Sequence, residues 1–319
     1  MFKDRWEKES RLPPRQNTIK ALMDRLCPSQ TLELFTLLHG GLSHWHYKVI
    51  LDSEVYVLRL HDRNDIKAPM EAALARKISP FIPAPRVLKT LYIAPYWCSL
   101  LTFEEGITLR TLLLNPAEQK NLYDLSYQAG QLLLMLQNMP YASSGFFDES
   151  AALSTPFTPK DLLEHAHLCL ESDAVKTLLP LKLQDHLNCL FKEGERLLHV
   201  TQTPCLVHGD FDPSNMFVRV EKDKWIITSL IDWEYAHAGT YLQDAANWLR
   251  WRHHMPLEYM AGFSDALQEK GLLSTDADWQ TASFLDALAL LDLLKRTRPH
   301  QPIRTASLCA LIEERLQDL

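Results

Sequence analysis

The 319-residue sequence contains no run of about eighteen uncharged apolar residues, the length that a membrane-spanning helix needs. Its amino-terminal stretch MFKDRWEKESRLPPRQN mixes both charge signs and lacks the apolar core of an export signal. Internal repeats and low-complexity tracts are also missing. We therefore expect a cytoplasmic, globular protein without a membrane span. At 46% hydrophobic residues, the chain is long enough for two sub-domains of ordinary size.

Paired cysteines are missing as well, since no C-x-x-C motif occurs. The six cysteines are scattered, and each lies among apolar neighbours in the sequence. We expect reduced, buried thiols at all six positions, which are Cys27, Cys98, Cys169, Cys189, Cys205 and Cys309.

Positive charge is scarce in the second part of the chain. Residues 1–104 carry 15 Lys and Arg against 11 Asp and Glu, a balance of +4, whereas residues 105–319 carry 18 against 29, a balance of -11. This distribution argues against a nucleic-acid partner and favours, to a small degree, a cationic small-molecule partner. Surplus surface glutamate that serves only solubility would give the same balance. The sequence implies no protein partner.

The first part of the chain has the pattern of a small sheet. Short segments rich in Val, Ile, Leu, Tyr and Thr predict strands in TLELFTLL, WHYKVIL, VYVLRL, RVLKTLYI and WCSLLTFE. One helix, DIKAPMEAALARKIS, is expected to start near Asp65 and to end before Pro83 and Pro85. The segment NTIKALMDRLC predicts a second helix outside the sheet.

After Gly106 the apolar residues recur at helical spacing. Only residues 205–232 break this pattern, with three predicted strands, CLV, MFVRV and WIITSLI. We therefore predict an α+β fold of two lobes, an amino-terminal lobe of residues 1–104 and a larger helical lobe of residues 105–319. A cleft between two lobes is a usual place for a ligand.

Carboxylates and one amide follow the predicted strands at residues 205–232. In LVHGDFDPSN, Asp210 and Asn215 are five residues apart and can turn into one pocket, and SLIDWEYA places Asp232 at the end of the next hairpin. An amide oxygen and a carboxylate are hard ligands of the kind that Mg²⁺ takes together with phosphate oxygens. A nearby Asp210 can accept a proton from a hydroxyl, so the set is typical of phosphoryl transfer. The alternative is an ordinary Asx-rich turn that contains Pro213.

The pair HGDFDPSN and IDWEYA resembles the H-G-D-x-x-x-x-N and I-D-W/F-E motifs of the aminoglycoside phosphotransferase and choline kinase family. The resemblance covers about residues 30–255 and implies a protein-kinase-like fold, with a small antiparallel sheet and one main helix in the first lobe. It implies Asp210 as the catalytic base and Asn215 and Asp232 as Mg²⁺ ligands. His208 would support the loop, and Asp244 would have a structural role.

The same resemblance assigns ATP contacts to the first lobe. Backbone groups around Gly40, Gly41 and Ser43 would approach the phosphates, although a hairpin turn also explains the two glycines. Arg59 stands where the family usually has a lysine, and Glu71 lies at the spacing of its ion-pair partner. The segment that includes Thr102, Phe103 and Glu104 resembles the link that faces the adenine.

Acceptor contacts have only weak sequence signals. Asp212, Glu234 and Tyr235 are candidate substrate contacts, and an aromatic side chain beside Glu234 could hold an amine by a cation–π interaction. Aromatic side chains also serve as core, which we prefer for Trp248 and Trp251. The histidine pairs His44/His46 and His253/His254 lack the further ligands that a zinc site needs.

Three function classes are compatible with these motifs. The first is an ATP- and Mg²⁺-dependent kinase that phosphorylates a hydroxyl of a small, amine-bearing molecule such as an aminoglycoside, choline or ethanolamine. The second is a kinase-like nucleotide-binding protein without turnover, which the intact Asp210, Asn215 and Asp232 disfavour. The third is a protein kinase, which the missing D-F-G and A-P-E motifs disfavour. We predict the first.

Overall fold

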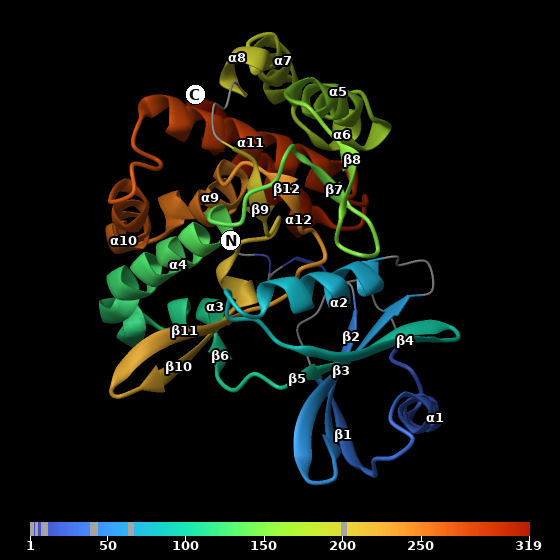
Figure 1. The fold of residues 1–319 in the computed structure, drawn as a ribbon. Coiled ribbons are helices and arrows are strands. Elements are labelled where there is room, and N and C mark those ends of the chain that lie inside the picture. The colour runs from blue at the N-terminus through green and yellow to red at the C-terminus, as the bar shows by residue number, and fades with distance from the viewer. Residues whose placement is uncertain (1–2, 4–5, 8–11, 39–43, 63–66, 199–202) are drawn as a thin grey trace.

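The computed structural model describes residues 3, 6–7, 12–38, 44–62, 67–198 and 203–319. Its first element group is a five-stranded sheet at one end of the molecule (Figure 1). The strand order is β1-β2-β3-β5-β4, and every neighbouring pair is antiparallel. The strands are β1 Leu32–Leu38, β2 Trp45–Leu51, β3 Glu54–Asp62, β4 Val87–Ile93 and β5 Tyr96–Thr102. All five predicted strands of the first part are present.

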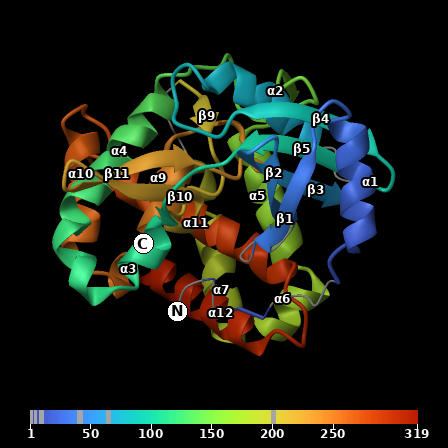
Figure 2. The ribbon, with the colours of Figure 1, turned by 90° about the horizontal axis from the view of Figure 1, so that it is seen from below.

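Two helices flank this sheet on different sides (Figures 1 and 2). Helix α1, Gln16–Leu26, packs Ile19 and Leu22 with buried strand residues such as Val49 in a separate small core. Helix α2, Lys67–Ile78, instead packs Leu74 and Ile78 into the larger core of the helical part. Helix α2 therefore joins the sheet to the rest of the chain. The boundary at residues 104 and 105 stays a prediction.

The second part is mostly helical and holds the larger core. Its α-helices are α3 Leu109–Leu113, α4 Leu122–Gln137, α5 Pro159–Leu170, α6 Asp173–Leu178, α7 Leu181–Phe191, α8 Gly194–Leu197, α9 Leu242–Leu249, α10 Leu257–Gln268, α11 Asp276–Lys295 and α12 Pro302–Gln317. Short 3-10 helices are η2 Pro116–Asn121, η3 Pro213–Asn215 and η4 Arg252–His254. Capping boxes at Thr158 and Thr275 fix the starts of α5 and α11.

Two small antiparallel sheets lie among these helices. One has the order β11-β10-β6, with β6 Ile107–Thr108, β10 Met216–Glu221 and β11 Lys224–Leu230. The other has the order β8-β7-β12-β9, with β7 Gly145–Phe147, β8 Leu153–Pro156, β9 Cys205–Val207 and β12 His237–Gly239. The expectation of only three strands after Gly106 was therefore wrong, because strands as short as two to four residues leave no readable alternation.

Two further expectations can be compared with the structure. Cys189 is exposed and Cys309 is partly exposed, so the expectation that all six thiols are buried was wrong. Among the described residues, no helix is both long and apolar enough to cross a membrane.

Candidate active site

The loop between β9 and β10 holds Asp210, and its second residue is a glycine that no other residue can replace without strain. Gly209 has φ +82°, and a Cβ atom there would lie 2.5 Å from the carbonyl oxygen of Tyr235. The chain therefore turns sharply after β9 and passes close to residue 235. This turn places Asp210 beside the segment that follows β11.

Asp244, in the first turn of α9, fixes the same loop by accepting hydrogen bonds from its backbone. Its two carboxylate oxygens accept hydrogen bonds from the backbone N–H groups of His208 and Gly209, at 2.7 and 2.9 Å. The side chain is fully buried. Burial raises the pKa of Asp244 to about 7, although the two N–H donors favour the charged form. Asp244 contacts backbone, which is the structural role that the resemblance implied.

His208 fixes the loop through its ring. The backbone N–H of Asp210 donates to Nδ1 at 3.2 Å, and Nε2 lies 2.9 Å from the carbonyl oxygen of Ile231, to which it donates. Burial lowers the pKa of His208, so the neutral ring with its proton on Nε2 satisfies both contacts. His208 therefore ties Asp210 to the residue before Asp232.

Asp210 and Asn215 lie in direct contact. The amide nitrogen of Asn215 donates to Asp210 Oδ2 at 3.0 Å and to the Asp210 carbonyl oxygen at 2.8 Å. The ammonium of Lys3 lies 2.5 Å from Asp210 Oδ1. The Asp210 side chain keeps 25% of its surface exposed, so it is accessible beside these partners.

Asn215 and Asp232 are brought together by the pairing of β10 with β11. The backbone N–H of Ile231 donates to the Asn215 carbonyl oxygen at 2.8 Å, which places Asp232 beside Asn215. Because the Asn215 amide nitrogen faces Asp210, its amide oxygen faces away from Asp210. Asp232 has φ +69°, and 35% of its side chain is exposed.

Arg59 on β3 bridges two carboxylates from different parts of the chain. Its Nη1 donates to Glu71 Oε2 at 2.6 Å and its Nη2 donates to Asp232 Oδ1 at 2.8 Å. Burial opposes the charge, but Glu71 and Asp232 outweigh it and raise the pKa of Arg59. The Nε of Arg59 is buried and has no hydrogen-bond partner among the described residues.

These contacts leave a donor set that suits Mg²⁺ and phosphate. The Asn215 amide oxygen and the second carboxylate oxygen of Asp232 are hard oxygen ligands, and the two residues lie just before β10 and just after β11. The Arg59 guanidinium adds a positive charge beside Asp232, which favours a phosphate nearby. The residues therefore fit a metal-bound nucleotide.

Asp212 lies inside the protein and not at an acceptor surface. It is 1% exposed, and its Oδ1 accepts from Arg110 Nη2 at 2.8 Å, while its Oδ2 accepts from Trp251 Nε1 at 3.0 Å. Burial raises the pKa of Asp212, but the Arg110 guanidinium, the Lys3 ammonium and the hydrogen bonds from Ser214 together outweigh it and hold the net pKa well below the usual range. This placement favours a structural role over the substrate contact that the sequence suggested.

Glu234 and Tyr235 form a small site that a lysine of the chain already contacts. The Lys67 ammonium lies 3.3 Å from Glu234 Oε2 and 4.1 Å from the centre of the Tyr235 ring. His44 Nε2 also lies 3.3 Å from Glu234 Oε2. Tyr235 is 39% exposed. An aromatic face and a carboxylate therefore hold an ammonium of the chain itself here, and the expected contact with a substrate stays a prediction.

The other aromatic side chains of this region belong to the core. Each is at most 5% exposed, and the set comprises Trp233, Tyr241, Trp248, Trp251 and Tyr259. Trp248 stacks on Tyr259 at 4.6 Å between ring centres. The prediction that Trp248 and Trp251 belong to the core is thus confirmed.

Of the predicted nucleotide contacts, the link after β5 is described and the glycine loop is not. The N–H of Thr102 donates to the Arg86 carbonyl oxygen at 3.0 Å, which removes it as a donor to a base. Phe103 and Glu104 directly follow β5 in the chain, and their contacts with a nucleotide stay a prediction. Gly40, Gly41 and Ser43 lie outside the described residues.

A cavity of about 290 Å³ lies elsewhere, between α4 and the β10–β11 hairpin, and none of the predicted site residues lines it. The expected cleft between lobes stays a prediction.

Sequence reasoning missed Lys3, Lys67 and Arg110. Each pairs with a site carboxylate that is more than a hundred residues away in the chain. No local pattern marks such a pair, so only the folded chain reveals it.

A model of the phosphotransferase enzyme family matches residues 35–285. Solved structures share the fold at low identity. Aminoglycoside 2'-phosphotransferase-IIIa in its GDP complex has a TM-score of 0.73 at 15% identity, with 95% of this chain and 99% of that chain covered. The GDP and kanamycin complex of APH(2")-IIia has a TM-score of 0.72 at 15% identity, covering 94% and 98%.

A thermostable mutant of aminoglycoside phosphotransferase APH(4)-Ia, in ternary complex with ADP and hygromycin B, has a TM-score of 0.67 at 16% identity, covering 94% and 97%. A search of curated proteins found no match. These comparisons confirm the predicted two-lobe, kinase-like fold.

Replacing Asp212 by Asn should destabilise the protein by about 3–5 kcal/mol, because the buried Arg110 guanidinium loses its counter-charge. Urea unfolding measures the loss. Glu221→Gln is the matched control, since Glu221 pairs with Arg219 at the surface and should cost no more than about 1 kcal/mol. Equal losses in the two variants would contradict the structural role of Asp212.

Proposed function

The chain belongs to the phosphotransferase enzyme family, and we propose that it moves the γ-phosphate of ATP, with Mg²⁺, to a hydroxyl group of a small, amine-bearing molecule. The observation that carries the proposal is the contact set of Asp210, Asn215 and Asp232. Asn215 donates to Asp210, and its backbone accepts from the residue before Asp232. The proposed base and the two proposed metal ligands thus lie together.

Asp210 is proposed as the catalytic base. It is partly exposed, and the Asn215 amide holds one of its oxygens in place. The other oxygen contacts only the Lys3 ammonium among the described residues, and an acceptor hydroxyl would take that position. Proton transfer to a positioned carboxylate contributes about 100-fold to 10,000-fold to such a reaction.

Asn215 and Asp232 are proposed to hold Mg²⁺ through one oxygen each. The metal would neutralise negative charge on the phosphate oxygens of the nucleotide. The rigid mounting of both ligands supports the assignment, because Met216 follows Asn215 and pairs with Leu230 of β11, and Ile231, next to Asp232, donates its N–H to the Asn215 carbonyl oxygen. His208 adds a fixed contact to Ile231.

Arg59 is proposed to contact a phosphate in the place of the usual lysine. Its guanidinium is held by Glu71 on α2, and its positive charge beside Asp232 favours a phosphate nearby. The backbone of Phe103 and Glu104 is proposed to face the base. The roles of Gly40, Gly41 and Ser43 in phosphate binding, and of Thr102 at the base, stay predictions.

A cationic acceptor is supported by two ammonium groups of the chain itself. Lys3 contacts the proposed base, and Lys67 lies between Glu234 and Tyr235. Carboxylates that already hold ammonium groups offer the same contacts to the amines of a substrate. The related structures named above contain kanamycin and hygromycin B, which are consistent with an acceptor of this class.

One observation favours the alternative of a nucleotide-binding protein without turnover. The Arg59 guanidinium pairs directly with Asp232, so a metal must share or displace this contact. A measurement of turnover separates the two functions.

We expect Mg²⁺-dependent nucleotide consumption to rise with at least one amine-bearing acceptor in a panel of aminoglycosides, amino alcohols and neutral sugars. The panel is run with ATP and with GTP, and product phosphorylation is read by mass spectrometry. A flat response to every amine, together with a clear response to a neutral sugar, would reject the cationic acceptor and retain the phosphotransferase.

With the acceptor found, Asp210→Asn should lower kcat by at least about 100-fold, because no carboxylate remains to accept the hydroxyl proton. Binding of Mg²⁺ and ATP, measured by calorimetry, should be retained, since Asp210 is not proposed as a metal ligand. Asp223→Asn in the exposed β10–β11 turn is the control and should keep full activity. Retained turnover in Asp210→Asn would remove Asp210 from the base role.

A further inference from the structure

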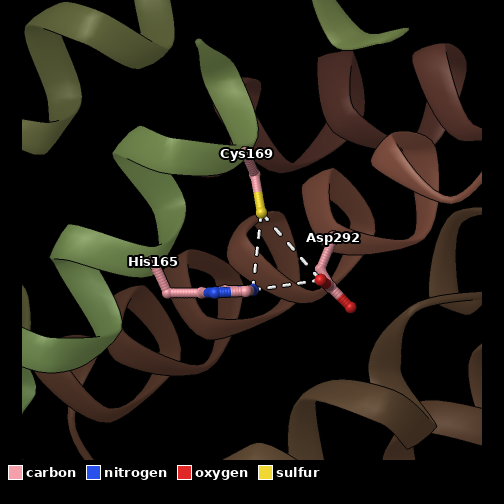
Figure 3. Close-up of side chains that lie close together, drawn as sticks. All are labelled: His165, Cys169 and Asp292. Carbon is pink, nitrogen blue, oxygen red and sulfur yellow. Dashed lines mark hydrogen bonds and ion pairs between the residues drawn. The ribbon is translucent and has the colours of Figure 1, made fainter. Parts of the chain in front are cut away.

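A second group of ligand-type side chains lies away from the site described above, between helices α5 and α11. His165 and Cys169 are four residues apart on α5, so they share one face of that helix, and Asp292 faces them from α11. Figure 3 shows the three side chains pointing toward a common point. Cys169 is buried, whereas 55% of the His165 side chain and 20% of the Asp292 side chain are exposed.

The three ligand atoms form a triangle of coordination size. His165 Nε2 lies 3.0 Å from Asp292 Oδ1 and 3.4 Å from Cys169 Sγ, and Sγ lies 3.9 Å from Oδ1. With metal–ligand bonds of about 2.0 Å to N and O and about 2.3 Å to S, a tetrahedral zinc ion separates these atoms by about 3.3, 3.5 and 3.5 Å. The observed triangle departs from that shape by no more than about 0.4 Å.

The same ring nitrogen, His165 Nε2, faces both the sulfur and the carboxylate oxygen. Without a metal, the Nε2–H and the Cys169 S–H each donate to Asp292 Oδ1, and the thiol hydrogen bond is long, at 3.9 Å from sulfur to oxygen. A cation between the three atoms would instead contact all of them directly.

A neighbouring arginine determines which carboxylate oxygen of Asp292 faces His165 and Cys169. Arg296 forms an ion pair with Asp292 Oδ2, which holds the carboxylate and leaves Oδ1 turned toward His165. Burial raises the pKa of the Cys169 thiol, Asp292 raises it further, and Lys295 and Arg296 oppose them. A bound divalent cation would displace the thiol proton, as metal binding to cysteine does generally.

We propose that His165 Nε2, Cys169 Sγ and Asp292 Oδ1 bind one divalent cation of the class that prefers nitrogen and sulfur ligands, with zinc the expected ion and water as a fourth ligand. Imidazole and thiolate select such cations over Mg²⁺. The bound ion would link α5 to α11, two helices that already pack together in the larger core. This site is separate from the proposed Mg²⁺ site and does not depend on the proposed function.

The test uses the full-length protein, freed of metal and titrated with Co²⁺ and then with Zn²⁺, with excess Mg²⁺ present to fill the other site. Co²⁺ bound to a thiolate in a tetrahedral site gives visible bands and a sulfur-to-metal charge-transfer band. The wild type should bind one equivalent with these bands, and Zn²⁺ should remove them.

Cys169→Ser should abolish the charge-transfer band. His165→Ala should weaken Co²⁺ binding by more than about 100-fold, because even partners of metal ligands cost about 10-fold to 100-fold when lost. His165 is largely exposed, so this variant should fold even if Cys169→Ser does not. Controls are His186→Ala and Cys189→Ser, which change an exposed histidine and an exposed cysteine elsewhere. Both controls should match the wild type.

Two results would overturn the proposal. One is a wild-type titration without thiolate bands, which would leave only a hydrogen-bonded group. The other is binding that His165→Ala leaves unchanged or that Cys189→Ser removes, which would place the cation elsewhere.

Discussion

The candidate site depends on one buried carboxylate that touches neither nucleotide nor acceptor in the proposed scheme. Asp244 accepts the N–H groups of His208 and Gly209, and these two contacts fix the turn after β9. Without this acceptor, two backbone donors would be buried unpaired, at about 1–3 kcal/mol each. The His208 ring, held in this way, connects Asp210 to Ile231, so the positions of the base and of Asp232 follow from one anchor.

Arg59 provides the second constraint, because it is the point at which three elements meet. It lies on β3, pairs with Glu71 on α2 and reaches Asp232 after β11. Helix α2 packs its apolar face against the larger core and not against the small core of the sheet. The sheet, the helix and the loop that carries Asp232 are thus held in one arrangement by packing and by charge together.

Much of this could be predicted from the sequence where the signal is local. The alternating segments of the first sheet, the helix before Pro83 and the strands on either side of Asp210 were all found. Strands β7 and β12 were not, because three residues such as His237–Gly239 carry no periodicity. The burial of Asp212 could not be read from the sequence, since its partner Arg110 is 102 residues away, and the group around His165 combines residues that only the packing of α5 and α11 brings together.

The most direct measurement of the central claim is a crystal structure with Mn²⁺ and a non-hydrolysable ATP analogue, in which anomalous scattering locates the metal. The account predicts a metal bound by the Asn215 amide oxygen and the Asp232 carboxylate, with the terminal phosphate between this metal and Asp210. A nucleotide bound with its metal away from Asn215 and Asp232, and with the Arg59–Asp232 pair unchanged, would contradict it.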